Sequence, residues 1–306
     1  MESSPVTEQL VTIRDYIRWA ASEFTRQKLS FGHGFATALD EAVYLVLHAL
    51  ELPWDWPQDY FDTRLTQQER EQVMAKLMLR IKTRQPAAYI THEAWFCGLP
   101  FFVDERVLVP RSPIAELIEH RFAPWIDPER VHRVLDLCTG SGCIAIACQY
   151  AFPEAEVTAS DISLDALEVA KINRERHGLE DSLALQASDL FDDLPRQRFD
   201  LIVSNPPYVD AEDMAALSDE FRAEPRLGLA AGEDGLLLVE RMLREAPDWL
   251  EEDGLLVVEV GNSQAAMMDK YPDLPLTWID FERGGDGVFC IGAAELAEYF
   301  KQGDQS

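Results

Sequence analysis

Hydrophobic residues over the first part of the chain, residues 8 to about 85, recur with the period of an α-helix. In LVTIRDYIRWAASEF they form one stripe, made of Leu10, Ile13, Ile17, Ala20 and Phe24. ALDEAVYLVLHALEL has a similar pattern. LTQQEREQVMAKLMLRIKTRQP predicts a helix that begins at a capping box of Thr66 and Glu69 and stops before Pro86. We therefore expect a small helical domain over residues 1–86.

The pattern changes twice after Pro86. Over residues 87–110, aromatic and β-branched residues alternate around a Gly98-Leu99-Pro100 turn, which predicts a β-hairpin linker. Further on, apolar runs alternate with helical stretches, and we expect strands at 133–138, 156–160, 183–186, 199–204, 254–260, 276–281 and 288–291. This alternation predicts an α/β domain over residues 111–306, with a doubly wound parallel sheet of seven strands and an antiparallel hairpin at one edge.

Composition places the chain among globular proteins, because 47% of its 306 residues are hydrophobic. No apolar run approaches the roughly 18 residues that span a bilayer, and the first residues, MESSPVTEQL, show no export signal. The five cysteines form no CxxC pair, which favours buried thiols over disulfides or a metal site. We expect a cytoplasmic protein without membrane contact or bound metal.

Charge is concentrated in the second part of the chain. Residues 1–110 hold 15 acidic and 11 basic residues, a net charge of −4, and residues 111–306 hold 40 and 16, a net charge of −24. Such a surface repels phosphate backbones, so we expect no direct contact with nucleic acid. It favours a basic protein partner, although it also suits a merely well-solvated surface.

The stretch VLDLCTGSGCIAIA (134–147) reads as a strand, a glycine loop and a helix. Gly140 and Gly142 let the backbone approach a ligand, and the helix that follows offers free N–H groups. Asp161 ends the next strand, where a carboxylate accepts the hydroxyl protons of an adenosine ribose. The loop alone also satisfies the looser GxGxxA fingerprint of dinucleotide-binding proteins.

Two further acids bear on the choice of cofactor. Asp136 lies inside the strand before the loop, where it could hold an amino-acid ammonium group or order the loop. Asp189 follows the third strand, where it could bind an adenine amino group or cap the turn at Leu190-Phe191. Taken together with the glycine loop and Asp161, the set favours S-adenosylmethionine.

The fourth strand ends in SNPPYVD. The side-chain carbonyl of Asn205 and the main-chain carbonyl of Pro206 are two acceptors, which suits a planar NH2 group with two donors. Tyr208 can pack against the flat face of that group, and Pro206 and Pro207 stiffen the corner because each fixes φ. The pattern indicates methyl transfer to a planar nitrogen, with no dedicated base.

Asn-Pro-Pro-Tyr, with LDLCTGSG upstream, resembles the amino-methyltransferases that act on adenine, cytosine or glutamine amides. FCGLPFFVDERVLVPRSPIAELIE and the helical N-terminal part extend the resemblance, over nearly the whole chain, to the HemK/Prm family of protein glutamine N-methyltransferases. Three stretches, PRSPIAE (110–116), SFGHGFATALDEA (30–42) and FERGGDGVF (281–289), are similar to the branch that methylates the third large-subunit ribosomal protein. The release-factor branch typically carries Pro-Arg-Pro-Glu-Thr-Glu at the first of these.

The resemblance implies a Rossmann-like S-adenosylmethionine-dependent methyltransferase domain and a substrate-recognising N-terminal domain. It implies a cofactor site made of Cys138, Thr139, Gly140, Ser141, Gly142, Asp161, Leu190 and Asn205. It also implies a glutamine site at Asn205, Pro206, Pro207 and Tyr208, with Asn205, Pro206 and Tyr208 as the catalytic groups. The family's loop often begins with glycine where this chain has Cys138. Asp136 and Asp189 rest on the residue patterns alone.

Three other functions remain open from the sequence. The same chemistry on release factors is the nearest, and a DNA adenine methyltransferase shares the Asn-Pro-Pro-Tyr end but needs a basic cleft. A non-catalytic assembly factor could dock on a basic ribosomal protein. The acidic segment VDAEDMAALSDEFRAEP is either a docking surface or a solvated helix face. Arg111 either braces the cofactor or forms a salt bridge. His33 is expected to be structural.

Overall fold

The computed structural model describes residues 9–303, which form two compact units. The first unit extends to Glu93 and includes a short later segment, Ser218–Ala223. The second contains Ala94–Leu217 and the chain from Glu224 onward. Residues 1–8, in which the sequence shows no export signal, and residues 304–306 lie outside the described residues.

The first unit is helical, as its apolar periodicity predicts. Its elements are α2 (Ile13–Arg26), α3 (Ala38–Ala49), η1 (Gln58–Tyr60), α4 (Gln67–Thr83), α5 (Ala87–Thr91) and, from the later segment, η3 (Phe221–Ala223). The predicted stripe of α2 is buried, from Leu10 to Phe24. The capping box of Thr66 and Glu69 is present, and α4 ends before Pro86. The start of the predicted hairpin linker is instead the short helix α5, whose alanines are buried.

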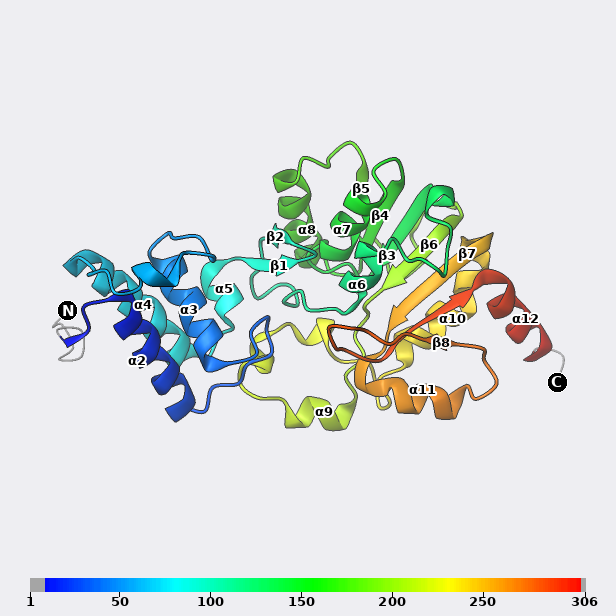
Figure 1. Cartoon of the computed structure of the whole chain (residues 1–306). Helices are drawn as coiled ribbons and strands as arrows, with labels where there is room; N and C mark the ends of the chain where they lie inside the picture. Colours follow the sequence, from blue (N-terminus) through cyan, green and yellow to red (C-terminus); the bar gives the residue numbers. More distant parts are fainter. Residues whose placement is uncertain (1–8, 304–306) are drawn as a thin grey trace. The chain divides into compact units, whose positions relative to one another are not determined.

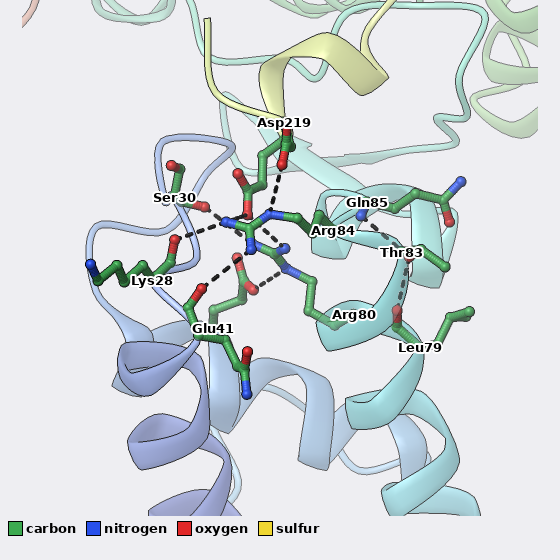
Figure 2. Close-up of polar contacts among 11 residues, drawn as sticks. Lys28, Ser30, Glu41, Leu79, Arg80, Thr83, Arg84, Gln85 and Asp219 are labelled. Carbon is green, nitrogen blue, oxygen red and sulfur yellow. Dashed lines mark hydrogen bonds and ion pairs between the residues drawn. The ribbon is translucent and has the colours of Figure 1, made fainter.

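A cluster of charged side chains lies inside this unit. Arg80 of α4 has no exposed surface, and its Nε donates to Glu41 Oε1 of α3 at 2.6 Å. Its Nη1 lies 3.4 Å from Oε1 of Glu220, whose side chain is also fully buried. Figure 2 shows Arg80 and Arg84 converging on Glu41 and Asp219. The later segment is therefore joined to the rest of the first unit by ion pairs, of which Arg80–Glu220 is fully buried.

The second unit begins with a small hairpin of β1 (Ala94–Phe96) and β2 (Leu99–Phe101). Its main sheet contains β3 (Arg133–Leu137), β4 (Glu156–Asp161), β5 (Leu183–Ala187), β6 (Phe199–Ser204), β7 (Leu250–Glu259), β8 (Thr277–Trp278) and β9 (Val288–Gly292). The strand order is β5-β4-β3-β6-β7-β9-β8, with parallel pairs up to β7 and antiparallel pairs at β9 and β8. The predicted doubly wound sheet with an antiparallel edge hairpin is confirmed.

Helices cover both faces of this sheet (Figure 1). They are α6 (Ile114–Glu119), α7 (Cys143–Ala151), α8 (Leu164–Arg176), α10 (Leu237–Trp249), α11 (Gln264–Lys270) and α12 (Ala293–Gly303). Alternate strand residues supply two cores: Val134 packs with α6 and α7, whereas Leu135 and Leu137 pack with α10 and α11. The helix α9 (Ala211–Ala216) and the 3-10 turns η2 (Pro128–Arg130), η4 (Arg226–Gly228) and η5 (Gly261–Ser263) lie in the connections. None of the helices between residues 9 and 303 has the length and apolarity needed to cross a membrane.

Candidate active site

The loops that follow four parallel strands meet at one edge of the main sheet. Because β3, β4, β5 and β6 run in the same direction, their carboxyl ends lie together. A cavity of about 570 Å³ opens there. The predicted residues that line it are Cys138, Thr139, Gly140, Ser141, Asp161, Asp189, Leu190, Asn205 and Pro207. Asp136, Gly142, Pro206 and Tyr208 do not line it.

The glycine loop after β3 has the conformation that its sequence requires. Gly140 and Gly142 have φ of +56° and +80°, and a Cβ at Gly142 would lie 3.2 Å from Ala170 Cβ. A Cβ at Gly140 would meet nothing within 4 Å, so this glycine faces open space at the cavity wall. Cys138 also has a positive φ, 58°, a conformation that glycine adopts more readily than other residues.

Asp136, in the strand before this loop, forms hydrogen bonds with the loop and with the helix after it. Its Oδ2 accepts from Thr139 Oγ1 at 2.5 Å and from the Ala145 N–H at 3.1 Å, and the side chain has no exposed surface. Burial raises the pKa of Asp136 to about 7, against the lowering effect of these hydrogen bonds. Of the two roles that the sequence leaves open for Asp136, its contacts are those of a residue that orders the loop.

Asp161 reaches the cavity from the end of β4. Its Oδ2 accepts from the Gly140 N–H and its Oδ1 from the Ser163 N–H, both at 2.9 Å. Burial raises the pKa of Asp161, and these backbone donors oppose the rise. Since a carboxylate has about four acceptor positions, it can also accept from a ligand hydroxyl.

Asp189 lines the same cavity but has a partner that the sequence did not indicate. Its Oδ1 accepts from Arg241 Nη1 of α10 at 2.8 Å, and Arg241 also lines the cavity. Both side chains are partly exposed, at 33% for Arg241 and 44% for Asp189. The neighbouring Leu190 is buried and has a positive φ of 52°. The Asp189 carboxylate at this wall of the cavity is therefore already hydrogen-bonded to Arg241.

Asn205 directly follows β6 and faces the cavity together with Pro207. Ser204 fixes the end of the strand, since its Oγ donates to the Leu137 carbonyl of β3 at 2.7 Å. Among the described residues, no side chain or main-chain group forms a hydrogen bond with the Asn205 amide. Its carbonyl oxygen is therefore available to a substrate, on a strand end whose position is set by the neighbouring strand.

Tyr208 is fixed by groups from β7 and the turn after it. Its hydroxyl donates to Glu259 Oε1 at 2.9 Å, and its main-chain carbonyl accepts from Ser263 Oγ at 2.9 Å. A Cβ at Gly261 would lie 2.4 Å from Tyr208 Cε2, so only glycine fits beneath the ring. Burial and the Glu259 carboxylate raise the pKa of Tyr208 well above its usual range.

Two of the three stretches that distinguish the branch come together at Glu259. From PRSPIAE, Ser112 Oγ donates to Glu259 Oε2 at 2.5 Å. From FERGGDGVF, the Gly287 carbonyl accepts from the Val260 N–H at 2.6 Å, next to Glu259. A Cβ at Gly285 of the same stretch would lie 2.7 Å from Pro113 Cβ. These sequence features therefore build the surroundings of Tyr208.

Arg111 forms a salt bridge with the acidic segment that follows Tyr208. Its Nη1 and Nη2 donate to the two carboxylate oxygens of Glu224 at 2.6 and 2.7 Å, and Glu224 is 3% exposed. Glu220 is also buried, in the first unit, and Asp210 caps α9. Part of the acidic segment thus serves internal contacts, which reduces the charge that it offers to a partner.

His33 is buried as well, with its ring 4.2 Å from that of Phe221.

Sequence reasoning missed three parts of this site. Arg241 gave no signal, because an arginine in an amphipathic helix is usually solvated. The segment from Pro225 to Ala231, which lines the cavity, has no motif. Glu259 did leave a signal, since an acid at the end of the apolar run LLVVEV is as unusual as Asp136 in VLDL.

The cavity fits S-adenosylmethionine in size and chemistry. Ligand pockets commonly measure about 300–1,000 Å³, with apolar walls and a few polar groups. Here Ile162 and Leu190 supply apolar wall, Asp161 supplies a carboxylate, and Gly140 leaves room for close approach. The fold and this site define a class of protein, the S-adenosylmethionine-dependent methyltransferases.

Comparisons with known proteins agree with this class and narrow it. Residues 121–234 match the family model described as "Methyltransferase small domain". The chain is 50% identical over 295 residues to the "Ribosomal protein uL3 glutamine methyltransferase" of Francisella tularensis subsp. tularensis (strain SCHU S4 / Schu 4), covering 96% of this chain and 94% of that protein. It is 50% identical over 293 residues to the protein of the same description from Burkholderia pseudomallei (strain K96243), covering 93% and 95%.

Among solved structures, a methyltransferase from Pyrococcus furiosus aligns with a TM-score of 0.47 and 20% identity, over 64% of this chain and 89% of that one. A similarity of that size identifies neither activity nor substrate. The curated relatives do establish the family. The chain belongs to the family of the ribosomal protein uL3 glutamine methyltransferases.

Proposed function

We propose that this enzyme transfers a methyl group from S-adenosylmethionine to the side-chain amide nitrogen of a glutamine in ribosomal protein uL3. The observation that carries the proposal is the position of Asn205, whose unengaged amide faces the cavity beside two prolines. The names of the relatives support uL3 as the substrate. We infer from the net charge of −24 over residues 111–306 that the substrate surface is basic and that nucleic acid is not contacted directly.

The chemistry requires that an amide nitrogen become nucleophilic. Its lone pair is delocalised into the carbonyl, so the NH2 group must be held and polarised. The Asn205 side-chain carbonyl and the Pro206 main-chain carbonyl accept its two N–H groups and stabilise the positive charge that develops on nitrogen. Tyr208 packs on the flat face of the amide. Positioning of this kind contributes up to about 7–11 kcal/mol in well-oriented reactions.

The cofactor residues divide into those that touch the ligand and those that shape its site. Asp161 accepts the ribose hydroxyls, the loop Cys138–Ser141 surrounds the amino-acid part, and Asp189 and Leu190 border the adenine. Asp136 and Gly142 keep the loop in shape. When bound, S-adenosylmethionine would supply the electrophilic methyl group and leave as S-adenosylhomocysteine, and the methylated nitrogen would release one proton to water. We also propose that the helical domain at residues 1–86 recognises the substrate and that the enzyme acts in the cytoplasm, where ribosomal proteins are made.

The test is methylation of purified substrates. The full-length protein is incubated with labelled S-adenosylmethionine and, separately, with uL3, a class one release factor and duplex DNA. We expect label on uL3 alone, and mass spectrometry of its peptides should place one methyl group on a glutamine. Preferential labelling of the release factor or of DNA would refute the proposed substrate, and binding to uL3 without label would favour the assembly-factor alternative.

A further inference from the structure

A buried acid and a close packing contact hold the ring of Tyr208. Glu259, the last residue of β7, is 4% exposed and accepts the Tyr208 hydroxyl at 2.9 Å. On one side the ring packs directly against Gly261, where a Cβ would lie 2.4 Å from Tyr208 Cε2. Rotation about the bonds of the tyrosine side chain is therefore limited by one hydrogen bond and one close packing contact.

Glu259 itself is held on its other side. Its second carboxylate oxygen accepts from Ser112 Oγ at 2.5 Å, and the same hydroxyl accepts from the Ile114 N–H at 3.2 Å, at the start of α6. Ser112 lines the cofactor cavity. One carboxyl group thus connects a wall of that cavity to the tyrosine of the Asn-Pro-Pro-Tyr loop.

Burying an ionised acid is costly unless strong partners compensate it. Glu259 has no ion pair among residues 9–303, although the charge of Arg111 acts on it favourably and that of Asp286 unfavourably. Arg111 is already committed to Glu224 through two hydrogen bonds. The direct partners of Glu259 are two hydroxyl groups, one of them on the residue that is to face the substrate amide.

We propose that Glu259 is a positioning residue for methyl transfer, which acts through the Tyr208 hydroxyl to hold the tyrosine ring against the glutamine amide. This inference rests on the proposed function of the Asn-Pro-Pro-Tyr loop and adds to it the group that orients its last residue. Glu259 does not itself line the cavity. Its loss should therefore lower the rate of transfer and leave cofactor affinity largely unchanged.

The test compares four variants with the wild type. Glu259→Leu removes both hydrogen bonds, Tyr208→Phe removes only the hydroxyl, and the double variant combines them. Glu259→Gln keeps a carbonyl that can accept from Tyr208 and an NH2 group that can donate to Ser112. The matched control is Glu252→Leu, the same substitution at an exposed position of the same strand.

We expect kcat for uL3 to fall about ten- to hundredfold in Glu259→Leu and in Tyr208→Phe, because each leaves a buried hydrogen-bonding group without its partner. The double variant should fall no further than the slower single variant, because both remove the same bond. Glu259→Gln should recover most of the rate, and the control should have the wild-type kcat. The dissociation constant for S-adenosylmethionine, measured by calorimetry, should be unchanged throughout.

Three results would overturn the inference: wild-type kcat in Tyr208→Phe, additive losses in the double variant, or weakened cofactor binding in Glu259→Leu. Tyr208→Phe keeps the comparison informative even where Glu259→Leu does not fold, since it leaves β7 unchanged. A wild-type enzyme that does not label uL3 would instead refute the proposed function. The two failures are therefore distinguishable.

Discussion

Replacing Arg80 by methionine should destabilise the first unit by about 3–5 kcal/mol, the usual cost of removing one partner of a buried ion pair. Methionine has a similar length and preserves much of the packing. The loss arises because Glu41, at 2.6 Å, and Glu220, at 3.4 Å, stay buried without their shared cation. Glu220 retains Arg84 at 3.2 Å, so most of the cost falls on Glu41.

The loss of unfolding free energy in Arg80→Met should also depend on pH. Burial raises the pKa of Glu41 even with Arg80 present, and the loss of Arg80 removes the opposing charge. In the folded variant, Glu41 therefore stays protonated at pH values above 4.5, its ordinary pKa, whereas in the unfolded chain it has already released its proton there. Its stability relative to the wild type is therefore best at acidic pH and falls as pH rises through the higher folded pKa.

Urea unfolding, followed by circular dichroism at about pH 5 and about pH 8, measures both effects. The matched control is Arg14→Met, which removes an exposed pair with Asp62 in the same unit and should change little. Adding Glu41→Leu to Arg80→Met should restore part of the loss. A deficit below about 1 kcal/mol, or one equal to that of the control, would refute the reasoning, because isolated surface pairs give values of that size.

Three further predictions concern the active site. Asn205→Ala should lower kcat by about a hundredfold or more with cofactor affinity largely intact, and normal turnover would remove the amide from the mechanism. Asp161→Ala should weaken S-adenosylmethionine binding in calorimetry by about ten- to hundredfold, and unchanged affinity would exclude it from the site. Gly261→Ala, whose Cβ would lie 2.4 Å from the Tyr208 ring, should lower kcat. Gly284→Ala is its control, because it has a positive φ but nothing within 4 Å, and an equal loss there would contradict the steric explanation.

The sequence predicted the elements whose determinants are local. The stripe of α2, the capping box of α4 and the buried strands β3 and β6 depend on residues close together in the chain, and all are present. The parallel sheet follows from these elements and the handedness of their crossovers. The strand predicted at 276–281 is only Thr277–Trp278, because at the sheet edge it has one neighbour, β9, to define its length.

The contacts that sequence reasoning missed join residues far apart in the chain. Tyr208 and Glu259 are 51 positions apart, and Arg80 and Glu220 are 140 apart. Neither residue of the second pair has a local signal, since an arginine on a helix and a glutamate in a connecting segment are usually solvated. The predicted roles of Asn205, Asp161 and the glycine loop stay predictions, although these residues do line one cavity.

The later segment of the first unit has a practical consequence for work on isolated fragments. A fragment that ended at Glu93 would contain every helix from α2 to α5 but not Ser218–Ala223. Arg80 would keep Glu41 and lose Glu220, and the site of the Phe221 ring beside His33 would be vacant. Weak folding of such a fragment would then reflect a missing piece of its own interior. A synthetic peptide spanning Ser218–Ala223, added in trans, would be the reagent that completes it.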